Sequence, residues 1–275
     1  MKMIRMKSVI AGIFIFLLPF VVSAQSFLLQ DVPADETKLG FRYLRPDFKE
    51  GDGLTFLSGV YDFSVSIPVG SKVNIVGSLP FGVIGVEGVD TESGIGNIYV
   101  GLQHRLNSTA EKGLSASLGI FLPTMPEDKF SVFLIGVYSN YFEFQKFFPN
   151  TLTVYGNLAY HRIKSNGWMF NLEIGPNIMI ATGDNDADTE VLIHYGLSGG
   201  YRVHDVAFKA ELAGMAILTE DVDEFGDRFA HMLAFGVQWT RGPVRPGIFY
   251  KIYLKEELRD VVSGVIGIKL DVVLK

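Results

Sequence analysis

About twelve stretches of alternating apolar and polar residues follow one another along this chain, and their connections are short and long in turn. A strand that separates lipid from water must alternate in this way, because successive side chains point to opposite faces of a sheet. Within a bilayer every backbone N–H and C=O must also be paired, which requires a sheet closed on itself. The pattern therefore predicts an all-β protein, a transmembrane antiparallel β-barrel of about twelve strands.

The alternation is clearest in the second half of the chain. Between Val191 and Tyr201 the odd-numbered positions are apolar, aromatic or glycine, and the next stretch places Phe208 on its apolar face and Lys209 on the other. Charged residues on one face would be costly in the dry core of a β-sandwich, which is the weaker alternative. The predicted strands are residues 37–46, 55–67, 72–80, 94–106, 113–122, 151–163, 167–181, 190–202, 205–218, 229–240, 244–255 and 261–273.

Connection lengths predict the topology. If the N-terminus lies in the periplasm, the periplasmic turns are residues 68–71, 107–112, 164–166, 203–204 and 241–243. The predicted extracellular connections, nearly all longer and more acidic, are 47–54, 81–93, 123–150, 181–189, 219–228 and the shorter 256–260. An even number of strands returns the C-terminus to the periplasm, as in bacterial single-chain barrels.

The longest connection, residues 123–150, is open to two interpretations. Residues 132–138 are apolar enough to form a strand, but a thirteenth strand would reverse the sidedness of all later ones. We therefore predict a folded loop. Within it, residues 141–148 could form an amphipathic helix that folds over or into the barrel mouth and shelters their aromatic side chains from water, and the sequence leaves this open.

The N-terminus has the features of a secretory signal peptide. Lys2, Arg5 and Lys7 precede an apolar run from residue 9 to 22, and small residues precede Gln25. An uncleaved anchor is the alternative, but about fourteen residues rise only about 21 Å as a helix against a hydrocarbon core of about 30 Å. We predict cleavage after Ala24, so that residues 1–24 are the signal peptide and residues 25–275 form the barrel. The chain has no cysteine, which excludes lipid attachment and disulfides.

Composition excludes two other classes of protein. Although 48% of the residues are hydrophobic, no segment after the signal has about eighteen uninterrupted apolar residues, so a helical membrane protein is not expected. Signal removal takes three of the 24 basic residues and none of the 30 acidic ones, which leaves a net charge of about −9. An acidic surface argues against nucleic acid as a partner.

Charged and histidine side chains recur at positions predicted to face the lumen. A lumen of twelve strands is narrower than that of general porins, so passage would be selective. Both charge signs occur in similar number, so the simpler interpretation is that they pair across the lumen and hold the wall, and the alternative is contact with a solute. The candidates are Arg42, Asp62, Arg105, His161, Glu173, His194, Lys209, Glu211, Lys251, Lys269 and Asp271.

The sequence predicts no metal site, no cofactor and no enzymatic activity. Asp184, Asp186 and Asp188 are spaced as in a calcium loop, but the glycine and glutamate of an EF-hand are missing, so they are weak candidates beside the interpretation as solvated surface acids. No histidine is followed two residues later by serine, as a hydrolytic dyad on a strand would require, and no nucleophile, zinc or phosphate-loop motif is present.

A family resemblance rests on two motifs. The segment SGIGNIYVGLQHRL at residues 93–106 resembles the G-x-G-D-x-x-x-G-x-K-Y strand opening of a family labelled putative MetA-pathway of phenol degradation, and Pro123-Thr124 is similar to a second family feature. Asn97 replaces the usual Asp, and Met125 stands where Gly is common. The resemblance implies an outer-membrane barrel that carries hydrophobic or aromatic compounds.

The C-terminal strand resembles the insertion signal of outer-membrane proteins through Gly267, Leu270 and Val272, although the chain ends in Leu274-Lys275 rather than in an aromatic residue. The expected partners are therefore the barrel assembly machinery, outer-membrane lipid and lipopolysaccharide, and a small-molecule solute. We predict a passive channel or uptake protein for small solutes in the outer membrane. The alternative is a non-transporting surface or structural barrel whose acidic extracellular loops bind cations, lipopolysaccharide or a ligand.

Overall fold

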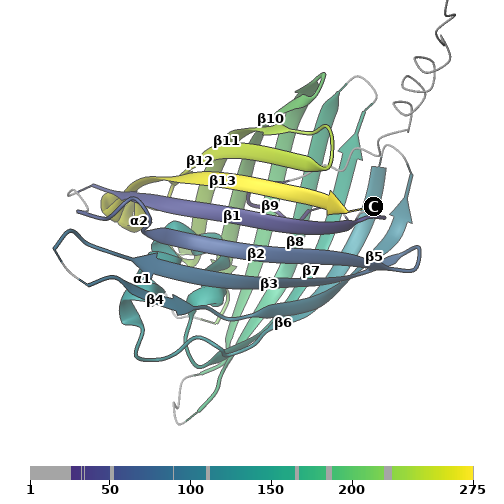
Figure 1. Ribbon diagram of the computed structural model, residues 1–275. Coiled ribbons are helices and arrows are strands. Elements are labelled where there is room, and N and C mark those ends of the chain that lie inside the picture. The colour runs from purple at the N-terminus through teal and green to yellow at the C-terminus, as the bar shows by residue number, and fades with distance from the viewer. Residues whose placement is uncertain are drawn as a thin grey trace, which may run out of the picture.

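The structure is a computed structural model that describes residues 26–31, 33, 35–49, 53–88, 90–109, 112–164, 167–183, 188–219 and 225–274. Within them one antiparallel sheet runs in the order β2-β1-β13-β12-β11-β10-β9-β8-β7-β6-β5-β3-β4 and closes through pairing of β2 with β3 (Figure 1). The strands are β1 (Thr37–Phe48), β2 (Gly59–Val69), β3 (Val73–Ile84), β4 (Glu92–Ile95), β5 (Tyr99–Ser108), β6 (Lys112–Phe121), β7 (Thr151–Ile163), β8 (Trp168–Ala181), β9 (Glu190–Val203), β10 (Val206–Ile217), β11 (Phe229–Trp239), β12 (Val244–Tyr253) and β13 (Val262–Leu274).

β4 and β5 are two parts of one wall strand. Both pair with β3, which uses residues 73–78 for β5 and residues 81–84 for β4. The wall described by the structure therefore has twelve strand positions, which confirms the predicted antiparallel barrel and its strand number. One predicted strand, residues 94–106, is interrupted at residues 96–98, and another, 55–67, begins only at Gly59.

Short and long connections lie at opposite ends of the barrel, as predicted. Two to four residues join β2 to β3, β5 to β6, β7 to β8, β9 to β10 and β11 to β12, at the end where the C-terminus lies (Figure 1). The opposite end carries the helices η3 (Phe225–Arg228) and α2 (Glu256–Val261), so the last connection is helical rather than a simple turn. None of the helices in the described ranges is long and apolar enough to cross a membrane.

The side chains alternate between the outside and the lumen of the barrel. Phe208 is 51% exposed on the outer surface, whereas Lys209, the next residue, is 9% exposed. Glu211, Lys251 and Asp271 are buried in the interior of the barrel, while the large exposed side chains of the wall are mainly apolar. A soluble protein has the opposite distribution, so the outer surface suits lipid.

Spin labels test this assignment directly. We expect a nitroxide on Phe208→Cys to be strongly relaxed by oxygen, which concentrates in hydrocarbon, and one on Lys209→Cys to be sheltered from it. The chain contains no cysteine, so each label is the only one. Equal oxygen relaxation at both positions in reconstituted bilayers would contradict the assignment.

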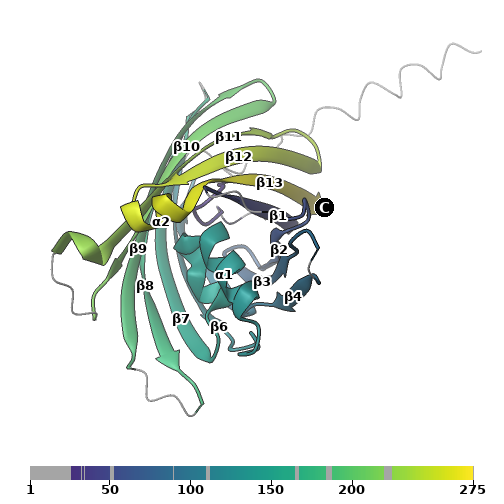
Figure 2. The ribbon, with the colours of Figure 1, turned by 90° about the vertical axis from the view of Figure 1, so that its left-hand side faces the viewer.

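The segment between β6 and β7 folds into the barrel. It forms α1 (Phe130–Ser139) and η2 (Tyr141–Phe147), and Figure 2 shows α1 inside the ring of strands. The folded-loop prediction is therefore confirmed, and the alternative of a strand over residues 132–138 is wrong. Helix α1 packs one side against the wall: Val132 and Ile135 are buried, and both would touch a Cβ placed on Gly82 of β3, whereas Phe130 at its start is exposed.

Candidate functional site

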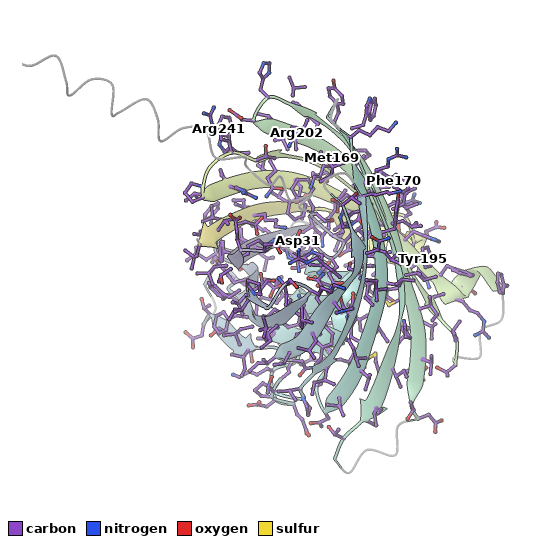
Figure 3. All side chains as sticks on the ribbon, turned by 90° about the vertical axis from the view of Figure 1, so that its right-hand side faces the viewer. Asp31, Met169, Phe170, Tyr195, Arg202 and Arg241 are labelled. Carbon is purple, nitrogen blue, oxygen red and sulfur yellow. The ribbon has the colours of Figure 1, made fainter. Side chains whose placement is uncertain are left out.

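Two segments fill the lumen of the described barrel. The first consists of α1 and η2, called here the plug helices. The second is Ser26–Asp31, called here the N-terminal segment, whose Asp31 lies inside the ring of strands whereas Tyr195 lies on its outer side (Figure 3). A functional site in this barrel must therefore be sought between these segments and the wall.

Glu211 on β10 anchors the start of the N-terminal segment. Its carboxylate accepts hydrogen bonds from the Ser26 hydroxyl at 2.9 Å, from the Phe27 N–H at 3.0 Å and from the Leu28 N–H at 2.7 Å. Backbone N–H donors aimed at a buried carboxylate satisfy both its charge and their own polar groups. Farther along, the Gln30 N–H donates to Glu173 on β8 at 2.8 Å.

Two inward-facing glycines provide the space for the N-terminal segment. A Cβ on Gly196 of β9 would overlap the side chain of Leu29, and a Cβ on Gly236 of β11 would overlap the ring of Phe27. The Phe27 ring also stacks on Phe249 of β12, with centroids 4.8 Å apart. The wall is thus shaped to receive this segment.

Asp31 ends the N-terminal segment between two ammonium groups. It forms an ion pair with Lys38 and another with Lys269 at 3.1 Å. Burial alone would raise the pKa of Asp31, but the charges of Lys269 and Lys38 outweigh it and hold the pKa well below its ordinary value. A lowered carboxyl pKa adds stability that is complete above its ordinary value of about 3.9 and is lost as the pH falls further. These ion pairs therefore persist at neutral pH.

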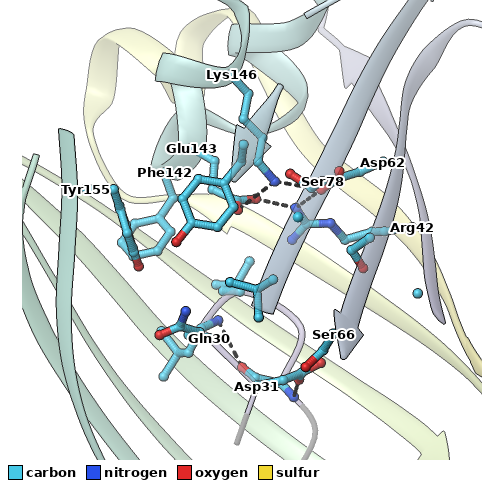
Figure 4. Close-up of a pocket in the computed structure, with 18 of the residues that line it drawn as sticks. Gln30, Asp31, Arg42, Asp62, Ser66, Ser78, Phe142, Glu143, Lys146 and Tyr155 are labelled. Carbon is cyan, nitrogen blue, oxygen red and sulfur yellow. Dashed lines mark hydrogen bonds and ion pairs between the residues drawn. The ribbon is translucent and has the colours of Figure 1, made fainter. Parts of the chain in front are cut away.

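An ion network attaches the plug helices to the wall (Figure 4). Arg42 on β1 pairs with Glu143 of η2 and with Asp62 of β2 at 2.9 Å, while Lys146 of η2 contacts Asp62 at 2.6 Å and Glu143 at 2.9 Å. Although burial would raise the pKa of Glu143, Arg42 and Lys146 lower it well below its ordinary value. Arg42 also donates to the Phe27 carbonyl at 3.2 Å, so it joins both inner segments.

Asn97 explains why β4 and β5 are separate. Its side-chain amide donates to the carbonyls of Gln145 at 2.9 Å and Phe148 at 2.7 Å and accepts the Met125 N–H at 3.0 Å. Its own N–H donates to the Lys146 carbonyl at 2.6 Å, so the strand gives up wall pairing here and binds the plug instead. The residue is 0% exposed.

Asn97→Ala is expected to loosen the plug helices. The change removes three side-chain hydrogen bonds and leaves buried backbone groups unpaired, which costs about 2–3 kcal/mol. Denaturant unfolding of the purified barrel measures the loss, and limited proteolysis locates it. Stability and cleavage equal to those of the unchanged chain would show that Asn97 does not hold the plug.

A cavity of about 200 Å³ remains in the lumen between the two inner segments. The rings of Tyr99, Phe121 and Tyr155 line one side together with Phe142 of η2. Small residues line the adjoining part of the wall, where Gly40, Ser64 and Ser78 lie in one row across β1, β2 and β3 and Ser78 pairs with Tyr99. Figure 4 shows Gln30 and Asp31 on one side of this space and the ion network of η2 on the other. The cavity therefore combines an aromatic wall with a small, polar one.

The side chains predicted for the lumen all occupy inward-facing positions, but they have different surroundings. Those that line the cavity are Arg42, Asp62, Glu173, His194, Lys269 and Asp271.

The remaining five lie elsewhere in the lumen. Glu211 holds the N-terminal segment, the Lys209 ammonium lies 5.6 Å from the centre of the Phe27 ring, and Lys251 donates to the Asn140 side chain at 2.8 Å. Arg105 forms an ion pair with Asp35, and His161 is buried beside Gly113. Contact of any of the eleven with a solute stays a prediction.

The acid-rich loop predicted as a weak cation site cannot be placed in full. Asp184 and Asp186 lie outside the described residues, and Asp188 lies within them. In the part of the chain that the structure describes, no group of three or more His, Cys, Asp or Glu residues is placed to hold a metal ion.

Comparisons with known proteins identify the class of barrel. The family described as "Putative MetA-pathway of phenol degradation" matches residues 32–252. The structure is similar to the COG4313 outer membrane channel from Pseudomonas putida F1, with a TM-score of 0.61 and 14% identity over 91% of this chain and 100% of that one. The KdgM porin aligns with a TM-score of 0.52 and 6% identity over 86% and 99% of the two chains. The NanC porin aligns with a TM-score of 0.51 and 10% identity over 87% of this chain and 99% of that one. No curated protein matches the sequence.

Proposed function

Because the chain belongs to the family described as "Putative MetA-pathway of phenol degradation" and has the fold of outer-membrane channels, we propose that it is a passive channel or uptake protein for small solutes, including hydrophobic and aromatic ones. The observation that carries this proposal is the cavity with one aromatic wall in the middle of the lumen. The similar structures are named as a channel and porins, and we infer no catalytic activity for this chain.

The filled lumen determines which solutes suit this barrel. The N-terminal segment and the plug helices exclude the wide aqueous path of a general porin. Aromatic side chains bury much apolar surface and pair with other rings by offset or edge-on contact, so they favour a ring-bearing solute over a sugar. The small residues next to the rings, Gly40, Ser64 and Ser78, leave room for the solute. A narrow, partly apolar route is the result.

The test is uptake by intact cells, whose lipopolysaccharide slows the entry of apolar molecules. Cells that express the chain are expected to take up radiolabelled toluene and p-cresol faster than cells with an empty vector, while arabinose causes little swelling of liposomes that contain the purified barrel. Barrel inserted in the outer membrane without any gain in aromatic uptake would refute the proposal. Rapid arabinose entry would indicate a general porin instead.

The filled lumen also favours a second candidate, a surface or structural barrel that transports nothing. In that case the acidic long connections would bind cations, lipopolysaccharide or a ligand outside the cell. Removal of residues 220–224 would then abolish binding to whole cells and leave permeability unchanged. For either candidate we infer that lipid and lipopolysaccharide contact the outer surface and that the barrel assembly machinery inserts the chain.

A further inference from the structure

Asn177 of β8 lines the cavity but has no hydrogen-bond partner in the described structure. Neither its amide nitrogen nor its oxygen is bonded, although the residue is only 1% exposed. Buried amides are nearly always satisfied, and an unsatisfied one costs free energy that a bound group with a matching donor and acceptor recovers. The side-chain amide of Asn177 is therefore available to form hydrogen bonds with a ligand in the cavity.

Seven further polar atoms of the residues that line the cavity also have no hydrogen-bond partner in the described structure, namely Asp62 Oδ1, Ser78 Oγ, Tyr99 Oη, Gln145 Oε1, Glu173 Oε1, His194 Nδ1 and Asp271 Oδ1. The two hydroxyls can donate as well as accept, whereas the side-chain oxygen of Gln145 on η2 and Nδ1 of His194 on β9 are neutral acceptors. The Asn157 amide donates to Gln30 at 2.7 Å, so its oxygen faces His194 Nε2 at 3.2 Å, and Nε2 must carry the hydrogen. In the neutral ring Nδ1 is then an acceptor. Acceptors thus outnumber donors among the unpaired atoms of the cavity lining.

The aromatic rings of the cavity are arranged around these atoms. Tyr155, which pairs across the sheet with Asn177, stacks on His194 at 4.8 Å and meets Tyr99 and Phe121 edge-on at 5.8 Å and 6.0 Å. Phe142 of η2 meets His194 edge-on at 6.1 Å, from the plug side. A planar ring held among them would have its polar substituent close to Asn177.

The charges of the cavity do not favour an ionised ligand. Arg42 and Lys146 are neutralised by Asp62 and Glu143, and Lys269 by acidic partners that include Asp31. Lys38, the fourth cation of the lining, also pairs with Asp31, so among the described lining residues no cation is left to balance an anion, and unpaired acceptor oxygens would repel one. The carboxylate of Glu173 forms no ion pair with the described residues, but it already accepts hydrogen bonds from the Gln30 N–H at 2.8 Å and the Asn157 amide at 3.4 Å. A cationic solute would therefore exchange its hydration for a partner that is already engaged. The cavity suits a neutral molecule.

We propose that this cavity contains a binding site for a neutral aromatic solute that carries a hydrogen-bond donor, such as a hydroxyl group, and that Asn177 selects for that donor. The proposal rests on the proposed function, because it names the class of solute that the lumen prefers. A hydroxyl donates to one of the unpaired acceptors and accepts from the Asn177 amide nitrogen. An ether of the same shape can accept from the Asn177 amide nitrogen but leaves the acceptors unsatisfied, and a hydrocarbon leaves both kinds of group unsatisfied.

Three isomers of one formula test the proposal: p-cresol and benzyl alcohol have a donor, whereas anisole has none. Binding to the mature chain in nanodiscs is measured by calorimetry, with empty nanodiscs subtracted. We expect both alcohols to bind about tenfold more tightly than anisole. Asn177→Leu should bring the three affinities within about twofold, because the hydroxyl then loses its amide partner and only more weakly placed acceptors remain. The expected preference for the two alcohols is the reverse of the order given by simple hydrophobic partitioning, in which anisole binds best.

Asn171→Leu is the matched control. Asn171 is the same residue type on the inward face of the same strand, but it does not line the cavity and lies six residues, or about 20 Å, from Asn177. It should keep the tenfold preference. Gln145→Leu changes η2 and no wall strand, so it can be tested even if Asn177→Leu does not insert into the membrane. It should reduce the preference for the two alcohols over anisole at least threefold.

The outcomes separate this inference from the proposed function. Equal binding of the three isomers by the unchanged chain, or a preference that survives both Asn177→Leu and Gln145→Leu, overturns the donor site but leaves uptake of aromatic solutes intact. No binding of any isomer together with no gain in cellular uptake overturns the proposed function itself.

Discussion

Deletion of residues 26–31 is expected to raise the ion conductance of the barrel roughly tenfold, because it removes one of the two segments that fill a lumen of twelve strands. All six residues line the central cavity, so their removal joins the cavity to the end of the barrel where the short connections lie. The wall keeps all its backbone pairing. Glu211 and Glu173 lose their partners but gain water, so the shortened chain should still fold.

Planar bilayer recordings of the purified chain measure the change. The control replaces residues 26–31 with glycine and serine, which preserves length but removes the Phe27–Phe249 stacking and the contact of Leu29 with Gly196. We expect the conductance of this control to fluctuate between that of the unchanged chain and that of the deletion variant, because a segment without anchors leaves the lumen intermittently. A folded deletion variant with the conductance of the unchanged chain would show that the N-terminal segment does not limit passage.

The barrel wall could be predicted from the sequence because lipid and lumen impose a period of two on every wall residue. Phe208 and Lys209 illustrate this alternation, because the apolar side chain lies on the outer face of the wall and the charged one lies on the lumen face. The break between β4 and β5 could not be predicted in this way. Asn97 belongs to the recognised motif, but its partners Gln145 and Phe148 lie about fifty residues later in the chain, and only the folded plug brings them together.

The N-terminal segment was missed for a related reason. Six residues without periodicity give no structural signal, and Glu211 and Glu173 were predicted to face the lumen without any indication of what they bind. A usable signal did exist in Gly196 and Gly236, because a glycine at an inward wall position marks a close approach of another segment.

The cavity was only partly predictable. The alternation places Tyr155 and Asn177 inward, but it does not say which inward residues converge. Convergence depends on strand register, which sets Tyr99 opposite Phe121 and Tyr155 opposite Asn177. It also depends on the plug, which brings Phe142 against His194. Contacts of this kind follow from tertiary structure, so the sequence pattern indicates charged residues and histidines as lumen candidates but not the aromatic residues of the cavity.

Arg42→Met is expected to release the plug helices and to destabilise the folded state by about 3 kcal/mol. The substitution preserves much of the side-chain length, but Asp62 and Glu143 are then left with Lys146 as their common cation. Removal of one partner from a buried ion pair leaves uncompensated charge, which costs far more than the pair itself contributes. The contact with the Phe27 carbonyl is lost as well, so the two inner segments lose this polar connection.

Trypsin cleavage at Lys129 and Lys146 reports release of the plug, and urea unfolding in detergent reports the stability. Lys49→Met is the matched control, since it breaks an exposed ion pair with Asp260 at 3.4 Å and should change stability by no more than about 0.5 kcal/mol. Arg42→Lys should be intermediate, because an ammonium group keeps the charge but lacks the second nitrogen through which Arg42 donates to the Phe27 carbonyl. If Arg42→Met resists trypsin and unfolds at the same urea concentration as the Lys49→Met control, the ion network does not hold the plug, and Asn97 together with the enclosed apolar surface of α1 must do so.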